Sequence, residues 1–262
     1  MNVISSLRND RVKLVKQLQG RARARRKYEQ LVLEGVRLIG DALASGPKPN
    51  FALADEDAIA NNPAVSLMVD QLEWDGVTTL RVTHEVMQDM AETDTPQGIL
   101  AVFPMPNFTI PKMPDFVLVI DGWRDPGNLG TILRTAAAAS VPVVALMPGT
   151  VDPFNPKVLR AGMGAHFRVP LLTIDWHGLT AKYPEHALFL ADMGGETAYD
   201  EVDWSQQRAL VAVGEEAHGL SKAARALPHT VIHIPMQQDT ESLNAAVSAS
   251  LITYAARRHA LG

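Results

Sequence analysis

Short apolar runs alternate with longer segments in which apolar residues recur every three or four positions along most of the 262-residue chain. The first pattern predicts strands and the second predicts amphipathic helices. After residue 115 the short runs are almost wholly apolar, as in FVLVI (116–120) and ALVAV (209–213). Strands of this kind are buried on both faces, as in a mostly parallel sheet covered by helices. The pattern therefore predicts an α/β fold.

The expected elements form two groups, separated by four prolines within the eleven residues 104–114, which exclude a helix or a central strand there. Before this segment the expected strands are 31–33, 51–54, 79–82 and 98–103, and the expected helices are 8–26, 36–44, 64–72 and 84–90. After it the expected strands are 116–121, 143–147, 167–172, 187–191, 209–213 and 231–234, and the expected helices are 129–139, 156–163, 176–182, 222–227 and 243–259. We therefore expect a small α/β domain over 1–104, a Pro-rich linker over 105–115 and a larger α/β domain over 116–262.

Composition excludes several classes of protein. Hydrophobic residues make up 47% of the chain and charged residues 20%, which is typical of a globular protein. Cysteine is absent, which excludes disulfides, thiolate nucleophiles and Cys-ligated metals. No apolar run reaches the roughly 18 residues of a membrane span, and the N-terminus lacks the core of a signal peptide. We expect a cytoplasmic protein that does not contact membranes.

Charge is unevenly distributed. Residues 1–50 carry 11 basic and 4 acidic side chains, whereas the chain as a whole has a net charge of −5. The densest basic run comprises Arg21, Arg23, Arg25, Arg26 and Lys27. This run is either a solvated helix end or a contact for a polyanion.

Ligands bind α/β sheets at the loops that follow the carboxyl ends of strands, and three such loops carry polar residues beside glycines. In the first loop, Asn128 is a candidate helix N-cap, and Arg134 follows nearly two turns later on the same helix. Arg134 either faces a cleft together with Asn128 or is a core-edge arginine paired with an acid.

The second loop places Gly214 directly after strand 209–213, with Glu216 two residues later. A missing side chain there lets a ligand approach the backbone. The alternative is an ordinary strand-to-helix turn with Ser221 as the cap.

The third loop combines the apolar residues Ile234 and Met236 with Ser242 and Asn244, either of which can cap the last helix. Apolar side chains beside free backbone groups would suit an adenine ring. The chain has no P-loop, GxGxxG, HExxH or GxSxG motif, and its histidines lack metal-ligand spacing, so we expect no metal.

Taken in order, the three loops resemble motifs 1, 2 and 3 of the SpoU (TrmH-like) branch of the SPOUT RNA methyltransferases. The matching patterns are Asn128-x-Gly130-x-x-x-Arg134, Gly214-x-Glu216-x-x-Gly219-Leu220, and Ile234-Pro-Met236 followed by Ser242-Leu243-Asn244. Residues 4–9, 33–38, 93–99 and 152–170 also resemble segments of this family.

The resemblance implies a fold and an activity. The fold is a SPOUT-type α/β domain with a mostly parallel sheet and a deep trefoil knot, preceded by a small L30e-like substrate-binding domain. The activity is transfer of the methyl group of S-adenosyl-L-methionine (SAM) to a ribose 2′-hydroxyl, in 23S rRNA ahead of tRNA, by a homodimer. Two alternatives remain: an RNA-binding or assembly factor without catalysis, and a base-nitrogen methyltransferase of another SPOUT branch.

The resemblance also implies site residues. The catalytic cluster would comprise Arg134, Asn128, Glu216, Ser242 and Asn244, and the cofactor contacts would be Gly214, Ile234, Met236 and Leu243. Arg134 would either accept the hydroxyl proton or stay charged and bind a phosphate. The residues that would contact RNA phosphates are Arg8, Arg21, Arg23, Arg25, Arg26, Lys27 and Arg37.

Overall fold

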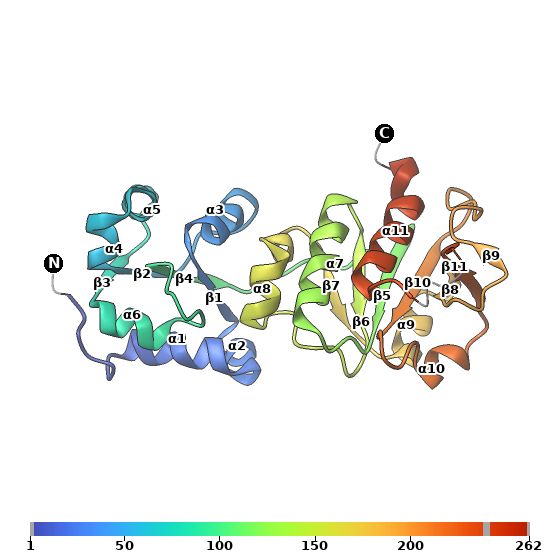
Figure 1. The fold of residues 1–262 in the computed structure, drawn as a ribbon, viewed down its shortest axis with the longest axis horizontal. Coiled ribbons are helices and arrows are strands. Elements are labelled where there is room, and N and C mark those ends of the chain that lie inside the picture. Colours follow the sequence, from blue (N-terminus) through green and yellow to red (C-terminus); the bar gives the residue numbers. More distant parts are fainter. Residues whose placement is uncertain (1–2, 238–241, 261–262) are drawn as a thin grey trace. The chain divides into compact units, whose positions relative to one another are not determined.

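The computed structural model describes residues 3–237 and 242–260 (Figure 1). Within these ranges the chain forms two compact units. The first comprises the described residues up to Pro106 together with Phe154–Phe167, and the second comprises Asn107–Pro153 and the described residues from Arg168 onward. No helix in the described ranges is both long and apolar enough to cross a membrane.

The first unit is built on a four-stranded sheet with the strand order β1-β4-β2-β3. Its strands are β1 (Gln30–Glu34), β2 (Phe51–Asp55), β3 (Thr79–Val82) and β4 (Ile99–Pro104). Strand β4 pairs antiparallel with β1 and β2, whereas β2 and β3 are parallel. Its helices are α1 (Asp10–Gly20), α2 (Ala22–Tyr28), α3 (Val36–Ser45), α4 (Glu56–Asn61), α5 (Pro63–Trp74), α6 (His84–Met90) and α8 (Pro156–Gly162).

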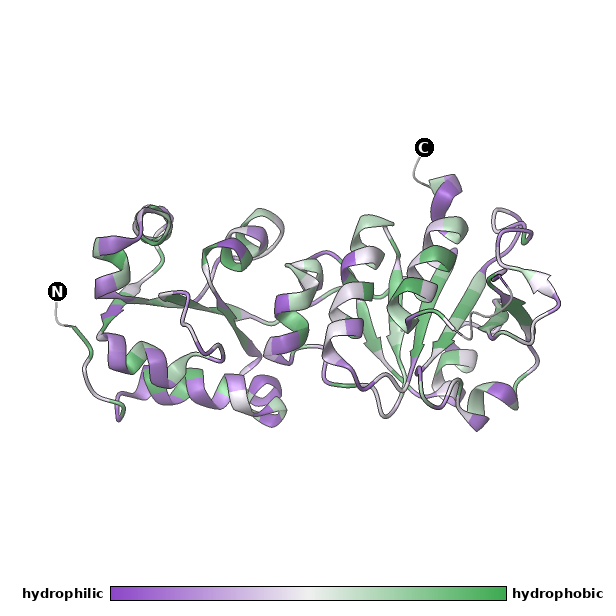
Figure 2. Cartoon of the chain, viewed as in Figure 1, coloured by the Kyte–Doolittle hydropathy of each residue, from purple (hydrophilic) through white to green (hydrophobic). Residues whose placement is uncertain are grey.

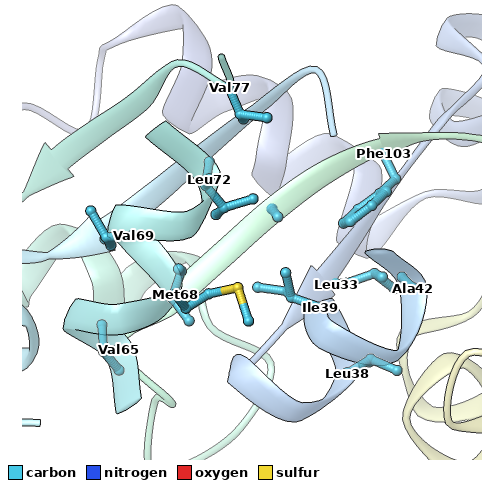
Figure 3. Packing of buried hydrophobic residues seen from close by; sticks show 14 of the residues in the cluster. Leu33, Leu38, Ile39, Ala42, Val65, Met68, Val69, Leu72, Val77 and Phe103 are labelled. Atoms are coloured by element: carbon cyan, nitrogen blue, oxygen red, sulfur yellow. The ribbon is translucent and has the colours of Figure 1, made fainter. Parts of the chain in front are cut away.

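Alternate residues of these strands face opposite sides, and each side has its own apolar core. Leu31 and Leu33 of β1 belong to a cluster with residues of α3 and α5, whose packing is seen in Figure 3. Val32 belongs to a second cluster with residues of α1 and α6. In Figure 2 the strands of this unit are mostly green, whereas its helices carry both green and purple residues, as amphipathic helices do.

The segment 154–167 packs in the first unit, although the sequence pattern had assigned it to the C-terminal domain. Leu159 of α8 and Phe167 are buried in the cluster beside α3, and the ring of Phe167 lies 5.7 Å from that of Phe103 between centroids. Phe167 ends a short 3₁₀ turn, and the following strand begins only at Leu171. The strand expected over 167–172 was therefore wrong at its start, because its first apolar residue belongs to another core.

The N-terminal basic segment forms two helices rather than the one expected over 8–26. The break is at Arg21, whose backbone is extended. Arg25 is only 4% exposed, and its guanidinium donates hydrogen bonds to the carbonyls of Leu18 (2.6 Å) and Gln19 (2.9 Å). These carbonyls end α1 and would otherwise lack helical partners. The prediction of Arg25 as an RNA-contacting residue was therefore wrong: its charge is used inside the unit.

The second unit contains a seven-stranded sheet with the order β7-β6-β5-β10-β8-β11-β9, and all its pairings are parallel. Its strands are β5 (Phe116–Asp121), β6 (Val143–Leu146), β7 (Leu171–Thr173), β8 (Ala187–Ala191), β9 (Thr197–Ala198), β10 (Ala209–Gly214) and β11 (Thr230–His233). From β5 the chain adds β6 and then β7 toward one edge of the sheet. It then crosses over and places β8 toward the opposite edge, with β10 between β5 and β8. Sheets of this class bind ligands beyond the carboxyl ends of the strands at such a reversal.

The helices of the second unit are α7 (Pro126–Ala138), α9 (Trp176–Lys182), α10 (Lys222–Arg225) and α11 (Ala245–Arg257). Residues of α9 and α10 share an apolar cluster with alternate residues of β5, β8 and β10. Helix α11 packs against α7, and the hydroxyls of Thr135 and Ser250 lie 3.0 Å apart between them. At the far end of α11, Arg257 is 5% exposed and holds Asp115 and the carbonyls of Ala139 (3.4 Å) and Ser140 (3.1 Å).

Candidate active site

The loop after β5 sets the start of α7. Asp125 is the N-cap, since its Oδ1 accepts a hydrogen bond from the backbone N–H of Asn128 at 2.7 Å, and Pro126 occupies the first helical position. The prediction of Asn128 as the cap was therefore wrong by one turn. Because Asp125 does the capping, the side-chain amide of Asn128 is left to contact other loops.

The loop after β10 is closed on itself. Glu215 and Gly219 exchange two backbone hydrogen bonds of 3.1 and 2.8 Å, and Gly219 has a φ of +64°. The buried Asp121 at the end of β5 accepts a hydrogen bond from the backbone N–H of Ser221 at 2.7 Å. Ser221 in turn caps α10, as the alternative interpretation of this loop had it. The turn between β10 and α10 is thus fixed at both ends.

Gly214 is required by the backbone of this turn. A Cβ at position 214 would lie 2.2 Å from the carbonyl carbon of Gly219 and 2.4 Å from the backbone nitrogen of Leu220. We had expected the space to be needed by a ligand. The structure gives a different reason, because no side chain fits there even before a ligand binds.

Three of the predicted catalytic side chains meet through hydrogen bonds. One carboxylate oxygen of Glu216, Oε1, accepts hydrogen bonds from Asn128 Nδ2 (3.1 Å), Asn244 Nδ2 (2.6 Å) and the backbone N–H of Ala245 (2.9 Å). Asn244 Nδ2 also donates to Asn128 Oδ1 at 2.9 Å. We call these three side chains the Asn–Glu–Asn network. It joins the first turn of α7, the loop after β10 and the start of α11.

Asn244 has a second role at the start of the last helix. Its Oδ1 accepts hydrogen bonds from the backbone N–H groups of Ala246 (3.0 Å) and Val247 (3.2 Å). Asn244 therefore both caps α11 and belongs to the Asn–Glu–Asn network. The sequence analysis had treated capping and a role in the site as alternatives. Ser242 caps no helix in the described ranges, and its exposed side chain lines the cavity described next.

A cavity of about 230 Å³ lies beside the network, at the carboxyl ends of β8, β10 and β11. We call it the strand-end cavity. All four residues predicted as cofactor contacts line it: Gly214, Ile234, Met236 and Leu243. Further apolar lining comes from Ala191, Val213, Ile232, Ala245 and Ile252. Its volume lies just below the roughly 300–1,000 Å³ of common small-molecule pockets.

The strand-end cavity also has acidic residues that the sequence analysis missed. Asp192 and Glu215 line it together with Glu216. Arg225 donates a hydrogen bond to Asp192 Oδ2 at 2.5 Å, and this contact lowers the pKa of that carboxyl group below its usual value. Asp192 directly follows β8, so inspection of a fourth strand exit would have found it.

Arg134 is not part of the Asn–Glu–Asn network. Its side chain is exposed on α7, does not line the strand-end cavity and forms no hydrogen bond or ion pair with any residue that the structure describes. Six residues at about 100° each turn Arg134 roughly 120° around the helix from Asn128. We had expected Asn128 and Arg134 to face the same cleft. Asn128 faces the network beside the strand-end cavity, and Arg134 does not.

The basic residues predicted to contact RNA, apart from Arg25, are exposed in the first unit. They are Arg8, Arg21, Arg23, Arg26, Lys27 and Arg37. Lys27 lies over the ring of Tyr28, with its Nζ 5.0 Å from the ring centroid. A cation beside an exposed aromatic ring is a combination that nucleic-acid surfaces use.

We predict that Gly214→Ala lowers the stability of the second unit by about 1–3 kcal/mol, the usual cost of overpacking, because Gly219 and Leu220 must move. Urea unfolding of the purified protein measures this difference. Gly20→Ala is the matched control, since a Cβ at that helix end meets nothing within 4 Å. An unchanged unfolding midpoint for Gly214→Ala would show that the turn adapts freely.

Known proteins match the chain over both units. Residues 115–254 match the SpoU rRNA Methylase family, and residues 9–101 match the MRM3-like substrate binding domain. The chain is 32% identical to mouse (Mus musculus) mitochondrial rRNA methyltransferase 3, over 89% of this chain and 68% of that protein. It is also 32% identical to 23S rRNA (guanosine(2553)-2′-O)-methyltransferase RlmP of Bacillus subtilis, over 97% of this chain and 98% of that protein.

A solved structure is similar over the whole chain. The AdoMet-bound rRNA methyltransferase from Sinorhizobium meliloti has a TM-score of 0.83 and 26% sequence identity, covering 100% of this chain and 99% of that one. AdoMet is the same compound as SAM. The SpoU match covers more than half of the chain, and its residues include every strand of the all-parallel sheet and the three loops described above. This chain therefore belongs to the SpoU rRNA methylase family.

Proposed function

We propose that this protein transfers the methyl group of SAM to a ribose 2′-hydroxyl of ribosomal RNA. The observation that carries the proposal is the Asn–Glu–Asn network beside the strand-end cavity, since it joins loops from three separate parts of the chain. Relatives named as rRNA methyltransferases, one of them a ribose 2′-O-methyltransferase of 23S rRNA, favour rRNA over tRNA. We propose the cytoplasm as the compartment in which it meets that RNA.

The residues of the strand-end cavity fit SAM. The side chains of Ile234, Met236 and Leu243 give it an apolar wall. The main chains of these three residues form no hydrogen bonds with any other described residue. Backbone groups that have no such partner beside apolar side chains can bind the edge and the faces of an adenine ring. The acidic residues Asp192 and Glu215 suit a ligand that carries positive charge.

SAM, when bound, supplies a methyl group on a positively charged sulfur, which leaves as a neutral thioether. The chain's part is to hold the ribose hydroxyl and the cofactor together, because positioning alone removes a large part of the barrier to a two-substrate reaction. Asn128 and Asn244 are fixed by Glu216, so their amide groups keep one orientation. Ser242 offers a hydroxyl at the same cavity.

Arg134 would act on the RNA rather than on the cofactor. An arginine exposed to water is a cation with a planar set of N–H donors, which matches the oxygens of a phosphate group. Of the two roles left open by the sequence, we therefore favour binding the phosphate next to the modified ribose. The hydroxyl proton would then pass to solvent as the new O–CH₃ bond forms.

We further propose a homodimer formed through one face of α11. Val247, Leu251 and Tyr254 are 47%, 40% and 46% exposed, and their spacing places them on one side of the helix. They line a shallow hollow together with Thr131 of α7. Arg134 lies one turn after Thr131, so it borders this α11 face. A second copy covering the face would bring Arg134 next to an interface, where the SpoU resemblance implies the active site.

We predict that the purified protein methylates rRNA and that the product is a 2′-O-methylnucleoside, located by nuclease digestion and mass spectrometry. Arg134→Ala should lower the methylation rate about a hundredfold or more, because a ribose that is no longer held by its neighbouring phosphate loses alignment with the methyl donor. SAM affinity measured by calorimetry should stay the same, because Arg134 does not line the cavity.

Arg208→Ala is the matched control for this experiment, because Arg208 is exposed and precedes the amino end of β10, opposite the cavity. Full activity of the Arg134 variant would contradict its role. SAM binding without methylation of any ribosomal RNA would instead favour the alternative of an RNA-binding factor.

We predict that Leu251→Glu combined with Tyr254→Glu converts a dimer into a monomer, because an unpaired charge is costly to bury in an apolar interface. Sedimentation equilibrium measures the mass. Leu67→Glu is the control, since Leu67 is 69% exposed on α5 of the first unit. A monomeric wild-type protein at micromolar concentration would overturn the dimer proposal.

For RNA binding, deleting the N-terminal segment is a poor test, because Val12, Val15 and Leu18 of α1 are fully buried. We predict that replacing Arg23, Arg26 and Lys27 by glutamine weakens RNA binding and flattens its salt dependence. The logarithmic slope should fall by up to about 0.7 for each phosphate that the protein no longer neutralises.

The control triple variant for this prediction replaces the exposed residues Lys112, Lys182 and Arg208 of the second unit by glutamine, so the net charge changes equally. Equal effects of both triple variants on affinity and slope would show that only overall charge matters.

A further inference from the structure

The first unit has a hollow of its own, of about 200 Å³, that the proposed methyl transfer does not use. Its lining includes Glu34, Arg37, Leu38, Gln97, Arg160 and Met163. These residues come from the end of β1, the first turn of α3, the loop before β4 and the end of α8, all within the first unit. We call it the α3–α8 hollow.

Two arginines of this hollow lack a partner among the residues that the structure describes. The side chains of Arg37 and Arg160 form no hydrogen bond and no ion pair with any residue in the described ranges. They come from different helices, so their shared position does not follow from helical spacing. Two unpaired guanidinium groups at one hollow attract a ligand with more than one negative charge, such as neighbouring phosphates of an RNA strand.

A buried carboxylate lines the same hollow as these two cations. Glu34 is 8% exposed, and its two oxygens accept hydrogen bonds from the hydroxyl of Thr93 (2.5 Å) and the backbone N–H of Glu92 (3.2 Å). These donors fix the carboxylate but are neutral, and Glu34 forms no ion pair with a cation in the described part of the chain. Each oxygen keeps the capacity to accept a further hydrogen bond.

This combination fits neither a free phosphate nor an apolar ligand. A buried carboxylate repels an anion placed directly against it, so the phosphates must lie at the arginines and a neutral group with N–H donors must face Glu34. Leu38 and Met163 add apolar surface, which suits a flat ring. A nucleotide has all three features: charged phosphates, a flat base and N–H donors on the base edge.

We infer that the α3–α8 hollow receives one unpaired nucleotide of the RNA substrate, with guanine preferred. Guanine presents two neighbouring N–H donors on its Watson–Crick edge, which matches the two oxygens of Glu34. Arg37 and Arg160 bind the flanking phosphates. Single-stranded loops and bulges expose such edges, whereas paired bases hide them. This inference rests on the proposed function in that RNA is the substrate, and it names the feature of the RNA that the first unit recognises.

The test uses the full chain and short hairpin RNAs that differ only at one unpaired position, which carries guanine, inosine or an abasic site. Fluorescence anisotropy measures each affinity. Wild-type protein should bind the guanine RNA about tenfold more tightly than the abasic RNA, the effect expected of one paired base contact. Inosine lacks the exocyclic amino group and should fall between them.

Two variants separate the roles. Glu34→Gln should remove the preference for guanine over inosine while leaving affinity for the abasic RNA unchanged. Arg160→Gln should weaken binding of all three RNAs alike and reduce the salt dependence, whereas Lys157→Gln, an exposed cation one turn earlier on α8, should do neither. Arg160 has no partner to lose within the described residues, so its variant stays informative even if Glu34→Gln alters the fold.

Equal wild-type affinity for the guanine and abasic RNAs would overturn the inference. Methylation of ribosomal RNA is measured separately, so the two proposals can fail independently. Normal methylation with no preference at the unpaired position would contradict guanine recognition by the α3–α8 hollow and would support the proposed methyltransferase function. Preference for guanine without methylation would support guanine recognition by the hollow and would contradict the proposed methyltransferase function.

Discussion

One carboxylate oxygen holds the candidate site together. Glu216 Oε1 accepts hydrogen bonds from Asn128, Asn244 and the backbone of Ala245, which belong to segments more than a hundred residues apart at the extremes. Strands β5 and β10 are paired, and α11 packs against α7, so these segments already lie close together. The shared oxygen is the one acceptor atom that links all three of them in the described residues. Because Asn244 also caps α11, the position of a whole helix is tied to the same atom. The cavity wall at Leu243 and Ala245 depends on that helix start.

Much of the fold could be predicted because burial on both faces leaves a clear trace in the sequence. The runs 116–121 and 209–213 predicted buried strands of a mostly parallel sheet, which the structure confirms; that they pair with each other at its centre required the structure. The errors occurred at two residues whose partners the local pattern does not reveal. One packs in a core formed by residues distant in sequence, and the other bonds to the end of the preceding helix. Phe167 looked like the start of a strand but fills the core of the first unit, and Arg25 looked like surface charge but caps α1. The trefoil knot stays a prediction, since chain threading leaves no trace in local pattern.

The site was predictable to the extent that its residues follow strands. Asn128, Glu216 and Asn244 were found by position and by resemblance, and their hydrogen bonds required the structure. Asp192 was missed because the exit of the predicted strand 187–191 was not inspected. That this exit lies beside β10 follows from strand order, which the sequence does not display. The side-chain direction of Arg134 likewise depends on where α7 begins, and that start was three residues earlier than expected.

The path of the chain has a consequence for how the protein can be divided. Residues 154–167 leave the second unit, complete the core of the first with Leu159 and Phe167, and return. Neither half is therefore an uninterrupted stretch of sequence. A fragment cut after Pro106 would lack part of its own interior, and the remaining fragment would carry a bare apolar strip that invites self-association. A separately folding version of the first unit would therefore have to include residues 154–167 as well as the chain up to Pro106.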